Sequence, residues 1–284
     1  MGTYVVTGSA SGMGYQAAER LRAAGHSVIG VDLHGAEVIA DLSTPQGRTT
    51  AARGVVAIAE GGRLDGAVLA AGLGPLPGAD RLALIYQVNF YGVVELLEAW
   101  QPALAAGKAK VVVVGSNSTT TTPMVPRRAV RSLLAGRPEK AQRAVRPFGP
   151  AASSLAYAAS KIAVSRWVRR QAVSVDWAGA GIRLNVLAPG AILTPLLTEQ
   201  LAAPRQAKAV QAFPVPVGGF GDAGQIADWI LFMLSDAANF LCGSVVFVDG
   251  GSDAYFRADA WPKGPSTLAL PRYLWRFAKF ARRR

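Results

Sequence analysis

Short runs of Val, Leu and Ile recur along the chain and alternate with longer stretches in which apolar residues are spaced three or four apart. The short runs do not alternate with polar residues, which is typical of parallel strands covered by helices on both faces. This pattern indicates a doubly wound parallel sheet, an α/β fold that occupies residues 1–254 as one domain. The strands are predicted at residues 4–7, 27–31, 37–40, 66–69, 110–114, 183–187 and 244–248, and the helices at 14–24, 44–60, 86–106, 154–177 and 223–234.

Two segments interrupt this pattern, and both are basic. Residues 123–150 hold seven Arg or Lys residues and one acidic residue, and residues 257–284 hold eight and one, whereas the rest of the chain holds 15 and 16. The net charge of +12 therefore belongs to two local surfaces suited to an anionic partner, and it argues against a nucleic-acid-binding core. We interpret 123–150 as an insertion with a helix at 129–135, either a substrate lid or a solvated loop, and 255–284 as a C-terminal extension.

Composition narrows the class of protein further. Hydrophobic residues make up 51% of the 284 positions and charged residues 17%, so the chain has enough apolar surface to fold. With a single cysteine, Cys242, and two histidines, we expect no disulfide framework and no metal site. The first predicted strand leaves no room for a signal peptide, and no uncharged apolar run approaches the roughly 18 residues of a spanning helix. We therefore expect a cytoplasmic protein.

The first predicted strand leads directly into a glycine-rich turn and then a helix. Gly8, Gly12 and Gly14 let the backbone turn tightly and let a pyrophosphate approach the amides at the helix N-terminus. An acidic residue, Asp32, ends the second strand 24 residues after Gly8. Its carboxylate can accept hydrogen bonds from the adenosine ribose and would repel a 2′-phosphate, so the sequence favours NAD over NADP. In the alternative interpretation, Asp32 only caps the next turn.

Tyr157 and Lys161 lie four residues apart in a predicted helix, so they share one helical face. An ammonium group beside the phenol is expected to lower the phenol's pKa. Bringing that pKa from about 10 to about 7 requires about 4 kcal/mol of preferential stabilisation of the phenolate, which the lysine and the positive nicotinamide ring of the cofactor are expected to supply together, so that the tyrosine can act as a base. Such a pair is also common on ordinary amphipathic helices. Ser116 and Ser118 follow the strand at 110–114, where a hydroxyl can stabilise charge on a substrate oxygen.

The spacing of the three glycines resembles that of the classical short-chain dehydrogenase/reductase family, and the resemblance continues over residues 3–252. It includes Asp249-Gly250-Gly251 after the last strand and Ala70-Ala71-Gly72, which stands where the family has Asn-Ala-Gly. The run at 38–43, the run at 70–75 and the insertion before Tyr157 look most like the 3α-hydroxysteroid dehydrogenase/carbonyl reductase branch, and coniferyl-alcohol dehydrogenases share that look. The resemblance implies a Rossmann-type fold.

The resemblance also implies roles for individual residues. It selects Ser116 over Ser118 as the catalytic serine and Tyr157 as the base. It further implies that Lys161 binds the nicotinamide ribose and that Asn89 holds a water linking this lysine to solvent. The expected cofactor contacts are Gly8, Ser11, Gly12, Met13, Asp32, Leu33, Asp41, Leu42, Ala71, Gly72, Tyr157, Lys161, Pro189, Gly190, Ile192 and Thr194.

These expectations together describe an NAD-dependent oxidoreductase. It would transfer a hydride between nicotinamide and a hydrophobic secondary alcohol or ketone, of hydroxysteroid or aromatic alcohol type, and would form a homo-oligomer. The alternative is a dinucleotide-sensing or scaffold protein that has the fold but no catalysis and contacts a membrane or a partner through its tail. We expect no nucleic acid among the partners.

The end of the chain predicts a short amphipathic helix from residue 270. One face holds Tyr273, Leu274, Phe277 and Ala281, and Arg272, Arg276, Lys279 and Arg283 lie largely opposite. This is the composition of an interfacial helix on anionic lipid, where each basic residue contributes about 1 kcal/mol. Peripheral membrane contact through residues 270–284, docking across a subunit interface and a frayed tail are the three interpretations that the pattern leaves open.

Overall fold

The computed structural model describes the chain except for residues 76–80, 203, 261–266 and 282–284. Within these described residues, seven parallel strands form one sheet in the order β3-β2-β1-β4-β5-β6-β9. They are β1 Thr3–Thr7, β2 Ser27–Asp32, β3 Val38–Ile39, β4 Gly66–Leu69, β5 Lys110–Val114, β6 Arg183–Pro189 and β9 Val245–Val248. All seven predicted strands are confirmed. The strand order runs in opposite directions from β1, so the carboxyl ends of β1 and β4 flank the position where a doubly wound sheet binds ligands.

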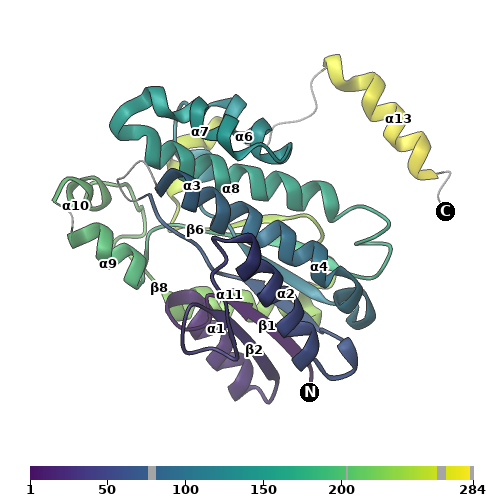
Figure 1. Cartoon of the computed structure of the whole chain (residues 1–284). Coiled ribbons are helices and arrows are strands. Elements are labelled where there is room, and N and C mark those ends of the chain that lie inside the picture. The colour runs from purple at the N-terminus through teal and green to yellow at the C-terminus, as the bar shows by residue number, and fades with distance from the viewer. Residues whose placement is uncertain (76–80, 203, 261–266, 282–284) are drawn as a thin grey trace.

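Helices cover both faces of the sheet (Figure 1). α2 (Pro45–Ile58), α4 (Gly92–Gly107) and α8 (Ala152–Gln171) enclose one core, and α1 (Gly12–Ala23) and α11 (Ala223–Leu234) enclose the other. Adjacent strand residues divide between the two cores: Val5 belongs to the first and Val6 to the second. This division explains why the strands are apolar at consecutive positions. The predicted doubly wound α/β fold is therefore confirmed.

Two predicted helices have different bounds in the structure. α8 ends at Gln171, not at residue 177, because the chain then turns, with Ser174 N–H donating to the Gln171 carbonyl and Gly181 at φ +88°. The predicted helix at 86–106 begins earlier, with α3 (Arg81–Tyr86) and a π-helical turn, η2 (Gln87–Tyr91), leading into α4. Among the described residues, the stretch 81–107 is the one that is long and apolar enough to cross a bilayer, and 56% of its apolar window is buried inside the protein.

The basic insertion forms a helical hairpin. α6 (Arg127–Leu134) confirms the predicted helix at 129–135, and α7 (Pro138–Val145) was not predicted. The two helices pack on each other and on α8, and they bury Ala129, Val130, Leu133, Ala141 and Val145. The segment is therefore an ordered layer over α8 and not a solvated loop.

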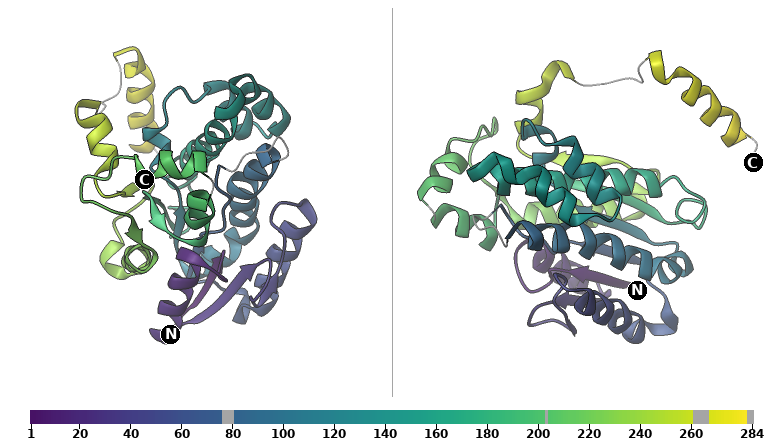
Figure 2. Two further views of the ribbon diagram at one scale, coloured as in Figure 1. Left: turned by 90° about the vertical axis from the view of Figure 1, so that its left-hand side faces the viewer. Right: turned by 45° about the horizontal axis from the view of Figure 1, so that its top comes forward.

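The remaining described elements lie mostly around the carboxyl end of the sheet or follow β9. They are η1 Glu60–Gly62, α5 Ser118–Thr121, η3 Arg146–Ala151, β7 Ile192–Leu193, α9 Pro195–Ala202, α10 Pro204–Gln211, β8 Gly221–Asp222, η4 Asp236–Ala238, α12 Ser252–Arg257, η5 Ala258–Ala260, η6 Thr267–Ala269 and α13 Leu270–Ala281. β7 and β8 form a small second sheet. The predicted helix from residue 270 is confirmed as α13, which stands apart from the sheet and its covering helices (Figure 2). Residues 261–266 and 282–284 of the predicted extension lie outside the described residues.

Candidate active site

The glycine-rich turn brings backbone close to backbone at the end of β1. Gly8 has φ +71°, and a Cβ there would lie 2.8 Å from the Ala71 nitrogen. A Cβ on Gly14 would overlap the Gly8 carbonyl, so neither position accepts a side chain. α1 starts after Ser11, whose side chain makes no capping hydrogen bond to the helix. The first amides of α1 therefore point at the adjoining crevice without a side-chain acceptor, which is the arrangement that binds a phosphate.

Asp32 lies at the carboxyl end of β2 beside this turn. Its carboxylate accepts hydrogen bonds from the Ala10 N–H at 2.9 Å and from the Leu33 N–H at 2.7 Å. The capping role that we considered as an alternative is thus present. A carboxylate has about four acceptor positions, so this one can also receive ribose hydroxyls. The structural and cofactor-binding interpretations of Asp32 are compatible.

A crevice opens at the carboxyl ends of β1, β2 and β4. Most of the predicted cofactor contacts line it: Gly8, Ser11, Gly12, Met13, Asp32, Leu33, Asp41, Leu42, Ala71, Gly72 and Thr194. Gly190, Ile192 and Tyr157 line a neighbouring cavity, whereas Pro189 is buried in β6 and Lys161 is buried in α8. Thr194 and Leu196 line both the crevice and the cavity, so the two spaces adjoin at these residues.

Ala71 and its neighbours keep their turn although the family's asparagine is absent. The Ala71 N–H donates to the Thr7 hydroxyl at 3.2 Å, and the Ala70 N–H donates to the Thr7 carbonyl at 3.2 Å. Asn89 holds Leu73, the residue after this turn. Its side chain accepts a hydrogen bond from the Leu73 N–H at 2.8 Å and donates one to the Leu73 carbonyl at 2.9 Å. β1 and η2 therefore anchor the turn between them.

Tyr157 and Lys161 lie on one face of α8, as their spacing predicts. The Lys161 Nζ lies 5.9 Å from the centre of the Tyr157 ring and donates to the Val114 carbonyl at 2.8 Å. Burial lowers the pKa of Lys161 to about 8. Asn89 Oδ1 and Lys161 Nζ both lie within 4 Å of the point that a Cβ on Gly72 would occupy. The predicted water between Asn89 and Lys161 stays a prediction.

The Lys161 ammonium by itself does not bring the pKa of Tyr157 below its ordinary value in this structure. Burial raises the pKa of the phenol, and the opposing effect comes from the Ser116 hydroxyl, whose hydrogen bond favours the phenolate. The lysine is directed at the Val114 carbonyl, and its own charge is penalised by the same burial. A net lowering of the phenol pKa therefore needs a further positive charge, such as the nicotinamide ring expected from the sequence.

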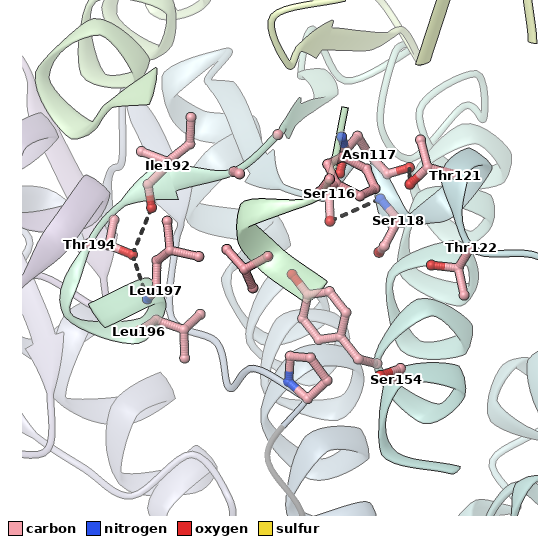
Figure 3. Close-up of a pocket in the computed structure, with 16 residues that line it drawn as sticks. Ser116, Asn117, Ser118, Thr121, Thr122, Ser154, Ile192, Thr194, Leu196 and Leu197 are labelled. Atoms are coloured by element: carbon pink, nitrogen blue, oxygen red, sulfur yellow. Dashed lines mark hydrogen bonds between the residues drawn. The ribbon is translucent and has the colours of Figure 1, made fainter. Parts of the chain in front are cut away.

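The two candidate serines face the same cavity (Figure 3). Ser116 makes the hydrogen bond to Tyr157, and its Oγ accepts from the Ser118 N–H at 3.1 Å. The Ser118 Oγ is buried and has no hydrogen-bond partner among the described residues. The geometry thus brings Ser116 to the tyrosine, in line with the selection made from the sequence, and leaves Ser118 available to a ligand.

The cavity has a volume of about 290 Å³ and two kinds of wall. The polar wall comes from the end of β5, from α5 and from the start of α8, and the apolar wall comes from β7 and the α9–α10 segment (Figure 3). The polar wall includes Ser116, Asn117, Ser118, Thr121, Thr122 and Ser154, and the apolar wall includes Ile192, Leu196, Leu197, Val210 and Phe213.

Sequence reasoning missed much of this cavity. Thr121 ends α5 and Thr122 follows it, and both line the cavity although no motif in the sequence marks them. None of the described residues that line the cavity belongs to the insertion at 123–150, so the cavity itself does not support the lid interpretation, which stays a prediction. Leu196 and Leu197 line the cavity from α9. Their position directly after Thr194 and Pro195 was the sequence signal that could have identified them as lining residues.

Comparisons with known proteins agree with this geometry. A family model described as enoyl-(acyl carrier protein) reductase matches residues 144–253. The 3-alpha-hydroxysteroid dehydrogenase/carbonyl reductase of Comamonas testosteroni is 39% identical over 258 residues, which are 90% of this chain and 98% of the relative. The cis-4-hydroxycyclohexanecarboxylate dehydrogenase of Sinomonas cyclohexanicum is 29% identical over 88% of this chain and 96% of the relative.

A solved structure shows the same relationship. The crystal structure of the 3-alpha-hydroxysteroid dehydrogenase from Pseudomonas sp. B-0831, complexed with NADH, is 42% identical and superposes with a TM-score of 0.84. The match covers 91% of this chain and 100% of that one. The overall fold is therefore shared with this related oxidoreductase. The chain belongs to the short-chain dehydrogenase/reductase family and, within it, resembles the 3α-hydroxysteroid dehydrogenase/carbonyl reductase branch.

Proposed function

We propose that this oxidoreductase uses NAD to interconvert a hydrophobic secondary alcohol and the corresponding ketone, of hydroxysteroid or aromatic alcohol type. The observation that carries the proposal is the position of Tyr157 and Ser116, which are hydrogen-bonded to each other in a partly apolar cavity that adjoins a crevice suited to a dinucleotide. The branch that the chain resembles includes enzymes named for hydroxysteroids and carbonyl compounds, which supports this substrate class.

NAD is favoured over NADP by the charge of the crevice. Asp32 supplies a carboxylate at the end of β2, and none of the described residues that line the crevice is Lys or Arg. A 2′-phosphate would therefore meet a negative charge and no compensating cation. The related hydroxysteroid dehydrogenase whose structure is known was crystallised with NADH, which supports the same choice.

The residues fit a nicotinamide dinucleotide, because the side-chain-free turn at Gly8 and Gly14 and the amides of α1 can receive its pyrophosphate. When bound, this cofactor accepts or supplies the hydride at C4 of its nicotinamide ring. In oxidation, the Tyr157 phenolate takes the proton from the substrate hydroxyl while the hydride leaves the carbinol carbon and the C–O bond becomes a carbonyl. Ser116 holds the substrate oxygen by a hydrogen bond and stabilises the charge that develops on it.

After the proton reaches Tyr157, Lys161 passes it onward and Asn89 positions the turn beside the lysine. A lysine with a pKa of about 8 gains and loses a proton near neutral pH, so it is suited to pass the proton onward. Asn89 fixes the turn that carries Gly72, and Gly72 leaves room between the asparagine and the lysine. In the reductive direction the same groups deliver the proton to the carbonyl oxygen.

The residues that line the cavity suit a substrate with an apolar body and a second polar group. Leu196, Leu197 and Phe213 can contact a hydrocarbon body, and the unpartnered Ser118 hydroxyl can receive a second polar group of the substrate.

The experiment measures NADH- and NADPH-linked reduction across a panel of ketosteroids, aromatic ketones and small polar ketones. We expect turnover with NADH on the first two classes, with kcat/KM at least tenfold above that for small polar ketones. Activity restricted to NADPH or to small polar ketones would contradict the proposal. Tight NADH binding with no turnover on any member would favour the non-catalytic sensor or scaffold instead.

A further inference from the structure

The C-terminal helix α13 carries large apolar side chains that are exposed to solvent. Leu270, Tyr273, Leu274 and Trp275 each retain between 53% and 59% of their full exposure. Figures 1 and 2 show the helix standing apart from the sheet and the helices that cover it. An isolated helix of twelve residues is marginal in water, so α13 requires a surface that covers its apolar face.

Basic residues occupy the opposite side of the same helix. Arg272, Arg276 and Lys279 follow one another at spacings of four and three, which places them on one face, and α13 contains no acidic residue. The Lys279 ammonium lies 4.7 Å from the centre of the Trp275 ring. This aromatic ring therefore lies at the boundary between the apolar and the basic face, the position at which tryptophan is enriched in membrane interfaces.

We propose that α13 is an interfacial helix that binds this protein to the surface of an anionic lipid bilayer. Leu270, Tyr273 and Leu274 enter the boundary between headgroups and acyl chains, and the helix lies in the plane of the membrane. Arg272, Arg276 and Lys279 extend along the helix surface to the anionic headgroups.

Charge favours lipid over the other two occupants that a basic amphipathic helix can have. A second copy of this chain offers little complementary charge, because the sequence outside the two basic segments has 15 basic and 16 acidic residues. A nucleic acid would neutralise the cations but would leave the apolar side chains of α13 in water. An anionic bilayer removes the apolar face of α13 from water and neutralises its basic face.

A second basic surface is available to the same membrane. The buried side of the α6–α7 hairpin packs on α8, and its outward side exposes Arg127, Arg128, Arg131, Arg137, Lys140, Arg143 and Arg146. Figure 1 and the left view of Figure 2 both place this hairpin at the same end of the molecule as α13. Because it presents charge without an apolar face, the hairpin adds electrostatic attraction and not insertion.

Co-sedimentation with vesicles tests the proposal on the full-length protein. The vesicles are phosphatidylcholine alone or phosphatidylcholine with about one-third phosphatidylserine. The charge variant is Arg272→Gln/Arg276→Gln/Lys279→Gln, and the apolar variant is Tyr273→Ser/Leu274→Ser/Trp275→Ser. The matched control is Val173→Ser/Val175→Ser/Phe240→Ser, which removes three exposed apolar side chains elsewhere. Circular dichroism and NADH binding confirm that each variant is folded.

The native protein and the matched control are expected to bind anionic vesicles and to release them as salt increases. The charge variant should lose on the order of a hundredfold in partition, since each cation near an anionic surface contributes about fivefold. The apolar variant should lose at least tenfold. Arg131→Gln/Lys140→Gln, which removes two cations from the hairpin, should lose up to about 25-fold at the same fivefold per cation. Brominated lipids should quench part of the tryptophan emission, and Trp275→Phe should remove that part.

Four results would overturn the proposal. The first is no binding to anionic vesicles beyond that of the charge variant. The second is equal binding to neutral and anionic vesicles. The third is an apolar variant that binds as the native protein does, which would leave only polyanion attraction. The fourth is a concentration-dependent dimer that α13 substitutions dissolve in the absence of lipid, which would make a second copy the occupant.

Discussion

Replacing Lys161 with methionine should stabilise the folded protein at neutral pH and make that gain disappear at high pH. Lys161 is 5% exposed, and burial lowers its pKa from 10.5 to about 8. At pH 7 the lysine is protonated in both the folded and the unfolded chain, so folding carries the whole cost of burying the ammonium. From pH 8 upward the folded protein gives up this proton, while the unfolded chain keeps it until about pH 10.5. The cost therefore falls as pH rises through this window.

The magnitude follows from the two pKa values. The full cost at low pH is about 3 kcal/mol, and most of it, between about 2 and 3 kcal/mol, is lost between pH 7 and pH 10. The variant also loses the hydrogen bond to the Val114 carbonyl, which costs about 1–2 kcal/mol at both pH values. The difference between the two pH values therefore isolates the buried charge.

Urea denaturation of the protein without cofactor, at pH 7 and at pH 10, measures this difference. We expect the advantage of Lys161→Met over the native chain to shrink by between about 2 and 3 kcal/mol between the two conditions. Lys140→Met changes an exposed lysine of α7 and should show no such dependence. If the advantage of Lys161→Met changes by less than about 1 kcal/mol, the ammonium is not penalised by burial and the proton-relay argument loses its basis.

Three further substitutions test separate parts of the account. Asp32→Ala removes the negative charge at the ribose end of the crevice, so the ratio of kcat/KM for NADPH to that for NADH should rise at least tenfold, and an unchanged ratio would show that Asp32 only caps its turn. Ser118→Ala removes a buried hydroxyl without a described partner, so thermal stability should be unchanged or slightly higher, and kcat/KM should fall only for ketones that carry a second polar group. Trp229→Ser/Phe232→Ser removes an exposed aromatic pair from α11 and should lower the oligomeric state measured by light scattering, and an unchanged state would show that this face does not join two copies.

The strands and the covering helices were predictable because each obeys one local rule. Val5 and Val6 face different cores, so a buried parallel strand reads as a continuous apolar run. α11 was predicted at its full length since Asp222 caps its first turn and its apolar residues repeat with the helical period. α8 was predicted too long because apolar residues continue to Trp177. The spacing of apolar residues does not reveal the turns that Gly179 and Gly181 allow.

The candidate site was predictable where a motif spans a single turn and not where distant segments meet. The sequence directly gives the spacing from Gly8 to Asp32 and the spacing within the Tyr157–Lys161 pair. The cavity wall from α9 and α10 has no such signal, because its residues become neighbours of Tyr157 only through the β7–β8 pairing. The effect of burial on Tyr157 was missed for a similar reason: sequence spacing places Lys161 beside the phenol but does not show the burial that raises the phenol's pKa.

The central claim is that the Tyr157 phenolic oxygen exchanges the substrate proton. Stopped-flow fluorescence of NADH binding, combined with NADH-linked turnover of Tyr157→Phe on the best ketone of the panel, tests it directly. The phenyl ring keeps the packing on α8, so we expect NADH affinity within about threefold of the native value and turnover reduced by at least a thousandfold, since proton transfer then has no donor. Turnover within tenfold of the native enzyme would contradict the claim.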